Sequence, residues 1–167
     1  MVVRPTPSVS TVDDVVAAGL LAAAVSGVPS TVYALWRGRD PLEAALAAGT
    51  LLLPHERRPE RLLPAAAVTH VALSLGWAAV LARSLPERAT VAWAVPAGLA
   101  IAGLDLGVVG RHLDRIRALP QPPQVADHVA YAITVGAVLQ RRRSNRRRRA
   151  LGRCSPRPSL GKPWRDQ

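Results

Sequence analysis

Phenylalanine is absent from this chain of 167 residues, and aromatic residues make up only 4% of it. A soluble core of this size normally uses phenylalanine for bulk, because aromatic side chains bury large areas. The apolar residues, 49% of the chain, are instead mostly alanine, leucine and valine, with glycine and proline scattered among them. Membrane helices favour small residues for close packing and tolerate glycine and proline. The composition therefore favours a membrane protein over a soluble globular domain.

Cysteine and lysine each occur once, as Cys154 and Lys162. A single cysteine excludes an intrachain disulfide and fits a reducing cytoplasm. The 21 arginines, together with abundant alanine, glycine and proline, indicate a GC-rich genome. The sequence also has no nucleotide-binding glycine loop, nucleophile elbow, paired-cysteine motif or zinc-protease helix. These absences favour a protein that is not an enzyme.

Four segments with few or no charges follow one another along the chain. They are residues 15–36, 65–82, 89–110 and 125–139. A helix rises about 1.5 Å per residue, so the first and third segments are long enough to cross a hydrocarbon core of about 30 Å. The last segment is shorter and has to borrow length from flanking side chains that reach the interface. The sequence thus predicts an all-α integral membrane bundle of about four transmembrane helices.

A shorter apolar run, residues 42–53, ends at Pro54. It is too short to cross a bilayer unaided, so we predict an interfacial or re-entrant helix. Counting it as a fifth span would improve the charge balance of the loops and place the N-terminus outside, but its length argues against this. Residues 120–124, which contain three prolines, are predicted to form a stiff extended segment before the last span.

The positive charge is concentrated near the C-terminus. Of the net charge of +11, residues 141–167 contribute +10. Arginine-rich segments stay on the cytoplasmic side, so we predict an inner (plasma) membrane protein with a cytoplasmic C-terminus. We expect disorder in this tail and in residues 1–12, which leaves residues 13–140 as the membrane domain. Because Asp13 and Asp14 precede the first apolar run, we expect that run to be retained rather than cleaved as a signal peptide.

Four ionisable residues lie within the predicted spans, where such groups are expensive and often functional. They are His70, Asp105, Asp127 and His128. The alternating direction of the spans places all four toward the membrane face opposite the basic tail. Such a group can ligate haem or a metal or relay protons; in the structural alternative each residue bridges helices through one hydrogen bond, and Asp127 caps the last helix. The histidines lack metal-site spacing, so we predict no cofactor.

Two further features of the spans concern backbone geometry. Residues 26–31 contain Pro29, which predicts a kink in the first span. Broken helices line binding sites in transporters, although a kink also serves packing. In the third span we predict close packing at Gly98, Gly103 and Gly107, of which Gly103 and Gly107 have the small-xxx-small spacing of helix contacts.

Seven arginines fall within nine positions directly after the last span. They are Arg141, Arg142, Arg143, Arg146, Arg147, Arg148 and Arg149. Beside a membrane each is expected to contribute about 1 kcal/mol of attraction to anionic lipid headgroups. We favour the lipid bilayer over nucleic acid as the partner of this run; the alternative is a determinant of topology with no specific partner.

Several short motifs between residues 15 and 140 show a resemblance to known sequences. They are residues 26–31, 38–44, 48–52, 104–107, 117–121 and 126–128. Together they resemble a group of small actinobacterial membrane proteins of unknown function. The resemblance implies a multi-pass membrane protein from a high-GC bacterium, and it lends no activity.

We interpret the chain as a multi-pass inner-membrane protein that serves as an accessory or assembly partner of another membrane protein. Two alternatives stay open. The first is a small redox or transport protein with a haem, metal or proton site near His70, Asp105 and His128. The second is a soluble helical protein that binds nucleic acid through its basic tail.

Overall fold

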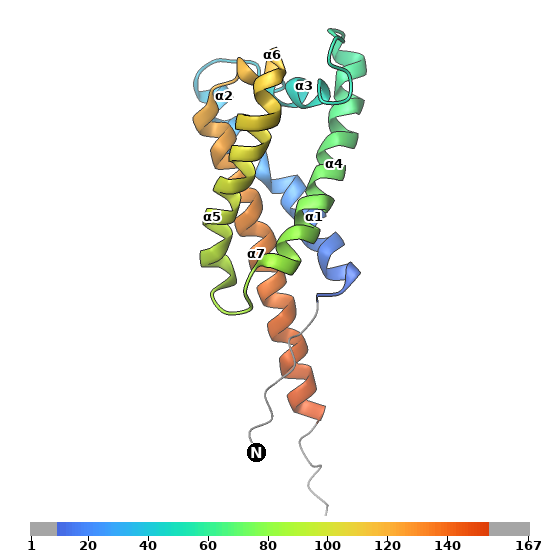
Figure 1. Cartoon of the computed structure of the whole chain (residues 1–167), viewed down its shortest axis with the longest axis vertical. Coiled ribbons are helices and arrows are strands. Elements are labelled where there is room, and N and C mark those ends of the chain that lie inside the picture. Colours follow the sequence, from blue (N-terminus) through green and yellow to red (C-terminus); the bar gives the residue numbers. More distant parts are fainter. Residues whose placement is uncertain (1–9, 154–167) are drawn as a thin grey trace, which may run out of the picture.

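The chain folds into a helical bundle, as the sequence predicts. The computed structural model describes residues 10–153, and this part of the chain contains helices and turns but no strand. Long helices run along one axis of the molecule, and short ones lie across one end (Figure 1). The long helices are α1 (Val12–Ser26), α2 (Val28–Trp36), α4 (Pro59–Ser84), α5 (Thr90–Ala102) and α7 (Gln121–Arg153), and the short ones are α3 (Glu43–Gly49) and α6 (Asp114–Arg117).

Three helical segments are long and apolar enough to cross a membrane. They are Val12–Trp36, Pro59–Ser84 and Thr90–His112, and they contain the first three predicted spans. Their outer faces expose large apolar side chains, which is the pattern expected where lipid is the solvent. The fourth predicted span, residues 125–139, lies inside α7. Because α7 has a polar start and an arginine-rich end, it is not among the helices that are apolar enough to cross a membrane.

The first apolar segment is interrupted, which confirms the predicted kink. α1 begins with a capping box, in which Thr11 and Asp14 exchange backbone-to-side-chain hydrogen bonds of 2.9 and 3.3 Å. It ends at Ser26, and α2 begins at Val28. Pro29 lies in the first turn of α2, where a backbone N–H has no partner within the helix and its absence costs little.

The short helices α3 and α6 close one end of the bundle (Figure 1). α3 has seven residues, so it is about 10 Å long and does not cross a bilayer. Arg115 of α6 donates to both carboxylate oxygens of Glu43 at 2.8 and 3.1 Å, and this hydrogen bonding raises the pKa of Arg115. A Cβ at Gly49 would lie 2.4 Å from the carbonyl oxygen of Leu62, so glycine allows α3 to touch α4.

α7 differs from the prediction at both of its ends. The extended segment predicted for residues 120–124 is wrong, because α7 begins at Gln121 and its prolines occupy the first turn, where they fit. The disorder predicted from residue 141 is wrong as far as Arg153, through which the helix continues. Residues 154–167, and residues 1–9 of the predicted N-terminal lead, lie outside the described residues.

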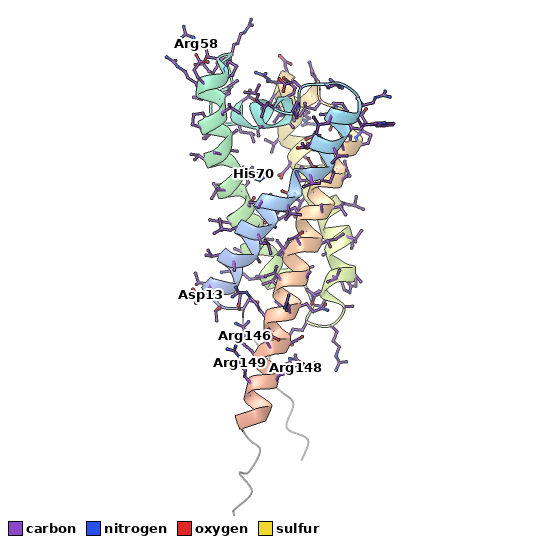
Figure 2. The ribbon with its side chains drawn as sticks, turned by 180° about the vertical axis from the view of Figure 1, so that it is seen from behind. Asp13, Arg58, His70, Arg146, Arg148 and Arg149 are labelled. Carbon is purple, nitrogen blue, oxygen red and sulfur yellow. The ribbon has the colours of Figure 1, made fainter. Side chains whose placement is uncertain are left out.

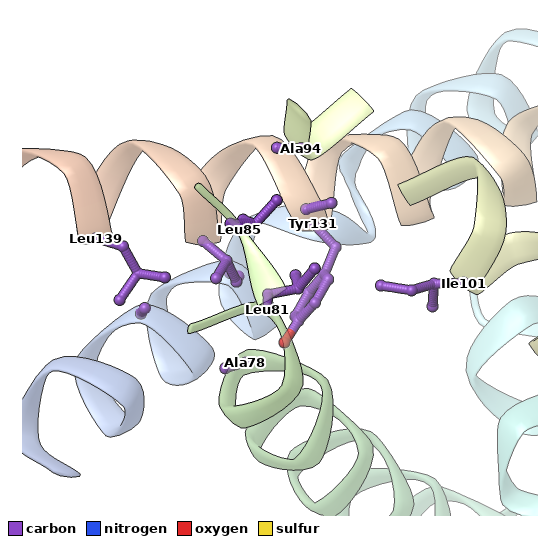
Figure 3. Packing of buried hydrophobic residues seen from close by; sticks show 11 residues of the cluster. Ala78, Leu81, Leu85, Ala94, Ile101, Tyr131 and Leu139 are labelled. Atoms are coloured by element: carbon purple, nitrogen blue, oxygen red, sulfur yellow. The ribbon is translucent and has the colours of Figure 1, made fainter. Parts of the chain in front are cut away.

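The core lies where α1, α4, α5 and α7 meet, and it is built largely from small side chains. Its alanines are fully or almost fully buried, with Leu81, Tyr131 and Leu139 between them (Figure 3). Close contact of α5 and α7 depends on Gly98, where a Cβ would lie 2.8 Å from the Cα of Val129. The packing predicted at Gly103 and Gly107 is wrong, because a Cβ built at either position has no atom within 4 Å beyond the adjacent backbone of its own helix.

Candidate functional site

A cavity of about 640 Å³ lies between α1, α2, α4 and α7, with α3 at one end. Ligand pockets in proteins typically measure about 300–1,000 Å³. Most of the lining residues are apolar, and alanine and leucine are the commonest of them. Lining residues on α1 and α2, such as Ala24 and Val28, and on α4, such as Ala67 and Leu73, are exposed. The cavity therefore opens sideways between two of the segments that are apolar enough to span a membrane.

The break between α1 and α2 borders this cavity, and two ionisable side chains hold it. His70 of α4 donates from Nε2 to the carbonyl oxygen of Ala23 over 2.9 Å, in the last turn of α1. Asp127 of α7 accepts a hydrogen bond of 2.9 Å from the backbone N–H of Ser30, in the first turn of α2. Helix ends leave such groups without partners, and in lipid there is no water to satisfy them. Asp127 thus caps α2, not the last helix as predicted.

A second helix irregularity brings Asp105 to the same cavity. α5 passes directly into a π-helical segment, η1 (Gly103–Val109), and then into a 3₁₀ turn, η2 (Gly110–His112). Short π-helical segments are rare and occur frequently at functional sites. The Asp105 Oδ2 atom accepts from Trp77 Nε1 over 3.2 Å and lies 3.3 Å from His128 Nε2. The side chains of Asp105 and His128 are 23% and 21% exposed, and both line the cavity.

Both ring nitrogens of His128 face oxygen acceptors. Nδ1 lies 2.8 Å from the carbonyl oxygen of Gln124, which can only accept. Nε2 faces the carboxylate of Asp105. A ring that donates at both nitrogens carries two protons, so the contacts fit an imidazolium beside a carboxylate. The geometry therefore places one exchangeable proton between His128 Nε2 and Asp105 Oδ2.

Two further polar residues line the cavity. The hydroxyl of Tyr131 donates to the carbonyl oxygen of Ser74, which links α7 to α4. The Thr69 Oγ1 atom is buried and has no hydrogen-bond partner in the part of the chain that the structure describes. A buried hydroxyl without a partner is costly, and in a cavity wall it is available to a ligand or to water.

The structure thus places all four predicted site residues around one cavity. His70 lies midway along α4, far from Arg146 at the other end of the molecule (Figure 2). Within residues 10–153 no group of three or more histidine, cysteine, aspartate or glutamate side chains is placed to hold a metal ion. His70 Nε2 and both nitrogens of His128 contact protein oxygens, so ligation of haem or a metal through these atoms would break existing contacts.

The third residue of the arginine run is buried. Arg143 is 6% exposed, and its guanidinium donates to the carbonyl oxygen of Ala82 over 2.9 Å and to the hydroxyl of Ser10 over 3.1 Å. A weaker contact of 3.5 Å reaches the carbonyl oxygen of Leu85. These carbonyls lie at the end of α4, where helical partners are missing and a cation is favoured.

Three more arginines of the run pair with carboxylates of the bundle. Arg142 and Arg146 both contact Asp14 at the start of α1, and Arg147 contacts Glu87 in the turn after α4. These contacts dock the arginine-rich part of α7 against the bundle, and they explain why the helix continues beyond residue 141. Three arginines of the predicted lipid-contact set are exposed and make no such contact within residues 10–153. They are Arg141, Arg148 and Arg149.

Sequence reasoning missed four members of the site, namely Trp77, Thr69, Gln124 and Tyr131. Trp77 was not considered, although an indole N–H within a membrane span needs an acceptor, and the lone carboxylate of the neighbouring span supplies it. Thr69 and Gln124 carry no signal in a single sequence. The π-helical segment was also missed; the two glycines that flank Asp105, which weaken an α-helix, are the available hint.

Comparisons of the chain with protein-family models, with curated proteins and with solved structures find no match. The site is therefore interpreted from its own geometry.

Proposed function

We propose that this is an integral membrane protein with four spans whose cavity binds a small, mainly apolar molecule taken from the bilayer. Length and composition support three of the spans. The fourth span is supported by the course of α7, which runs beside the other three (Figure 1). The two ends of the described chain also lie at the same end of the bundle, as an even number of crossings requires. Because arginine-rich segments stay on the cytoplasmic side, we place this end of the bundle in the cytoplasm and the protein in the inner membrane.

The observation that carries the proposal is the meeting of two helix irregularities at one cavity. The break after Ser26 and the π-helical segment around Asp105 both border it. Irregular backbone at membrane depth is tolerated where it is buried in protein or lines a cavity, and discontinuous helices build binding sites in transporters. An apolar wall with a few convergent polar groups is the usual composition of a small-molecule site.

This proposal is a form of the transport alternative raised by the sequence. An accessory or assembly role is compatible with it, but no contact among the described residues favours that role. Ligation in the redox form through His70 Nε2 or either nitrogen of His128 would displace the protein oxygens that contact these atoms. Nucleic-acid binding through the tail competes with the contacts of Arg142, Arg143, Arg146 and Arg147 inside the bundle. The resemblance to small actinobacterial membrane proteins stays a prediction.

Trp77 gives the cavity a built-in reporter. In a variant with Trp36, Trp93 and Trp164 replaced by phenylalanine, Trp77 is the remaining tryptophan. We expect 11-bromoundecanol, a heavy-atom quencher with an apolar chain, to quench its fluorescence saturably in nanodiscs. A variant that retains Trp93 instead, which is 57% exposed on α5, provides the control for simple partition into lipid and should be quenched without saturation.

A matched pair of cavity variants makes this experiment specific. Ala67→Phe fills the opening of the cavity, whereas Ala92→Phe adds the same side chain to an exposed position of α5 away from it. Saturable quenching should be lost in Ala67→Phe and kept in Ala92→Phe. Quenching that is equal in both variants, or unsaturable for Trp77, contradicts a binding cavity.

A further inference from the structure

The charges that face the cavity define what kind of molecule fits it. The described residues that line it include two carboxylates, Asp105 and Asp127, and two imidazoles, but no lysine or arginine. A phosphate or carboxylate headgroup would meet two carboxylates and no fixed cation. Like charges across an interface are strongly unfavourable, and opposite charges are favourable where water is excluded. The cavity is therefore matched to a cation and not to an anion.

Of the two carboxylates, Asp105 is the one available to a ligand. Asp127 is engaged with the N-terminus of α2, where the helix dipole and the Ser30 N–H already balance its charge. The contacts of Asp105 with Trp77 and His128 both use Oδ2. Its Oδ1 atom accepts no hydrogen bond from the described residues, and the side chain is 23% exposed toward the cavity.

We propose that the ligand is a hydrophobic monocation, an amine or quaternary ammonium with an apolar body, which pairs with Asp105 in exchange for the proton held by His128. The inference rests on the binding function proposed above. When the cation binds, His128 Nε2 releases its proton to water, the ring becomes neutral, and the cation takes over as the counter-charge of Asp105. The net charge of the site is unchanged, so one proton leaves for each cation that enters.

The direction of the pH dependence follows from all the titratable groups around the pair. η1 contributes Asp105, α4 contributes His70, and α7 contributes His128, Asp127 and Tyr131, whereas α1 and α2 present only hydroxyls. Protonation of either imidazole adds positive charge beside the ligand, and protonation of either carboxylate removes its partner. Each of these protonation steps weakens cation binding, so the affinity for the cation falls as the pH falls.

Three aryl probes of different charge separate this proposal from general apolar binding, and the cation and the anion among them are nearly equal in size. They are tetraphenylphosphonium, triphenylphosphine oxide and tetraphenylborate, none of which titrates near neutral pH. With the full chain in neutral detergent at pH 8, calorimetry should show the cation binding at least about tenfold tighter than the neutral probe, and the anion weakest. Below the titration of the pair, affinity for the cation should fall by about tenfold per pH unit. Two buffers of different ionisation enthalpy should report release of one proton per cation.

Variants assign the effect to the pair. Asp105→Asn should weaken cation binding at least about tenfold while saturable quenching of Trp77 by 11-bromoundecanol persists. His128→Gln should still bind the cation but with a flattened pH profile. Asp114→Asn, at a side chain that is 94% exposed in α6, is the control and should change neither property.

The outcomes distinguish this proposal from the more general one. If 11-bromoundecanol binds saturably but the anion binds as well as the cation, or cation affinity is independent of pH in the wild type, the exchange proposal is overturned and the cavity stands. If neither 11-bromoundecanol nor any of the three probes binds, both proposals are overturned. The wild-type comparison of cation and anion needs no variant to fold.

Discussion

Replacing Gly98 by alanine should destabilise the bundle, whereas the same change at Gly103, in the same continuous helical segment, should not. A Cβ at position 98 would lie 2.8 Å from the Cα of Val129 and 2.9 Å from the carbonyl oxygen of His128. These are backbone atoms of α7, so relief requires α5 and α7 to move apart. At Gly103 a Cβ meets no atom within 4 Å beyond the adjacent backbone of its own helix.

The expected magnitudes follow from two opposing contributions. Overpacking a tight contact typically costs about 1–3 kcal/mol, and alanine regains about 0.5–1 kcal/mol over glycine inside a helix. For Gly98→Ala the net change in the free energy of unfolding is therefore a loss of roughly 0–2.5 kcal/mol. For Gly103→Ala the second contribution acts alone, which predicts a change between zero and a gain of about 1 kcal/mol.

Unfolding by SDS in mixed micelles, followed by tryptophan fluorescence, measures both variants against wild type. The small-xxx-small spacing of Gly103 and Gly107 predicts a loss of stability at those two positions as well, because it places a helix contact there. A larger loss for Gly103→Ala than for Gly98→Ala would refute the packing of α5 on α7 that positions His128. Gly107→Ala is a second control, since its surroundings are equally open.

Three further predictions test the helix break, the basic helix and the orientation. In the same SDS assay, Asp127→Ala should lose about 1–2 kcal/mol because it uncaps α2, and His70→Ala about 0.5–1 kcal/mol; wild-type stability in both would show that the break does not need them. Arg143→Ala should lose about 1–3 kcal/mol because a buried carbonyl loses its donor, while exposed Arg148→Ala should stay within about 0.5 kcal/mol; equal effects would contradict the docked arrangement of α7. Cys154, the single cysteine, should react with a membrane-impermeant maleimide in inverted vesicles and not in intact cells, and the reverse pattern would place the C-terminus outside.

The segments that are long and apolar enough to cross a membrane could be predicted from sequence, because apolar length is a local property. A run without charges over about 20 residues is interpretable without knowing its neighbours. The continuation of α7 through the arginines was not accessible in this way. It depends on Asp14 and Glu87, which are distant in sequence and whose proximity to the run arises from the packing of α1 and the turn after α4.

The level in the bundle at which the site residues lie could be predicted from the sequence, but which of them contact one another could not. Alternating spans place His70, Asp105, Asp127 and His128 at one level of the bundle, and the structure has them around one cavity. Which residues meet depends on the rotation of each helix about its axis. The π-helical segment changes that rotation after Ala102, so no α-helical pattern drawn from the sequence assigns Asp105 to His128.

The contact between Asp105 and His128 is central to the account, and a double-mutant cycle tests it most directly. Asp105→Asn, His128→Gln and the double variant are compared by SDS unfolding at pH 7, with Asp114→Asn in place of Asp105→Asn as the matched control cycle. Polar contacts inside membrane proteins show coupling energies of about 0.6 kcal/mol on average and up to about 1.7 kcal/mol. We expect coupling of at least about 0.6 kcal/mol for Asp105 with His128 and none for Asp114. Additive effects of Asp105→Asn and His128→Gln would contradict the contact between the two side chains.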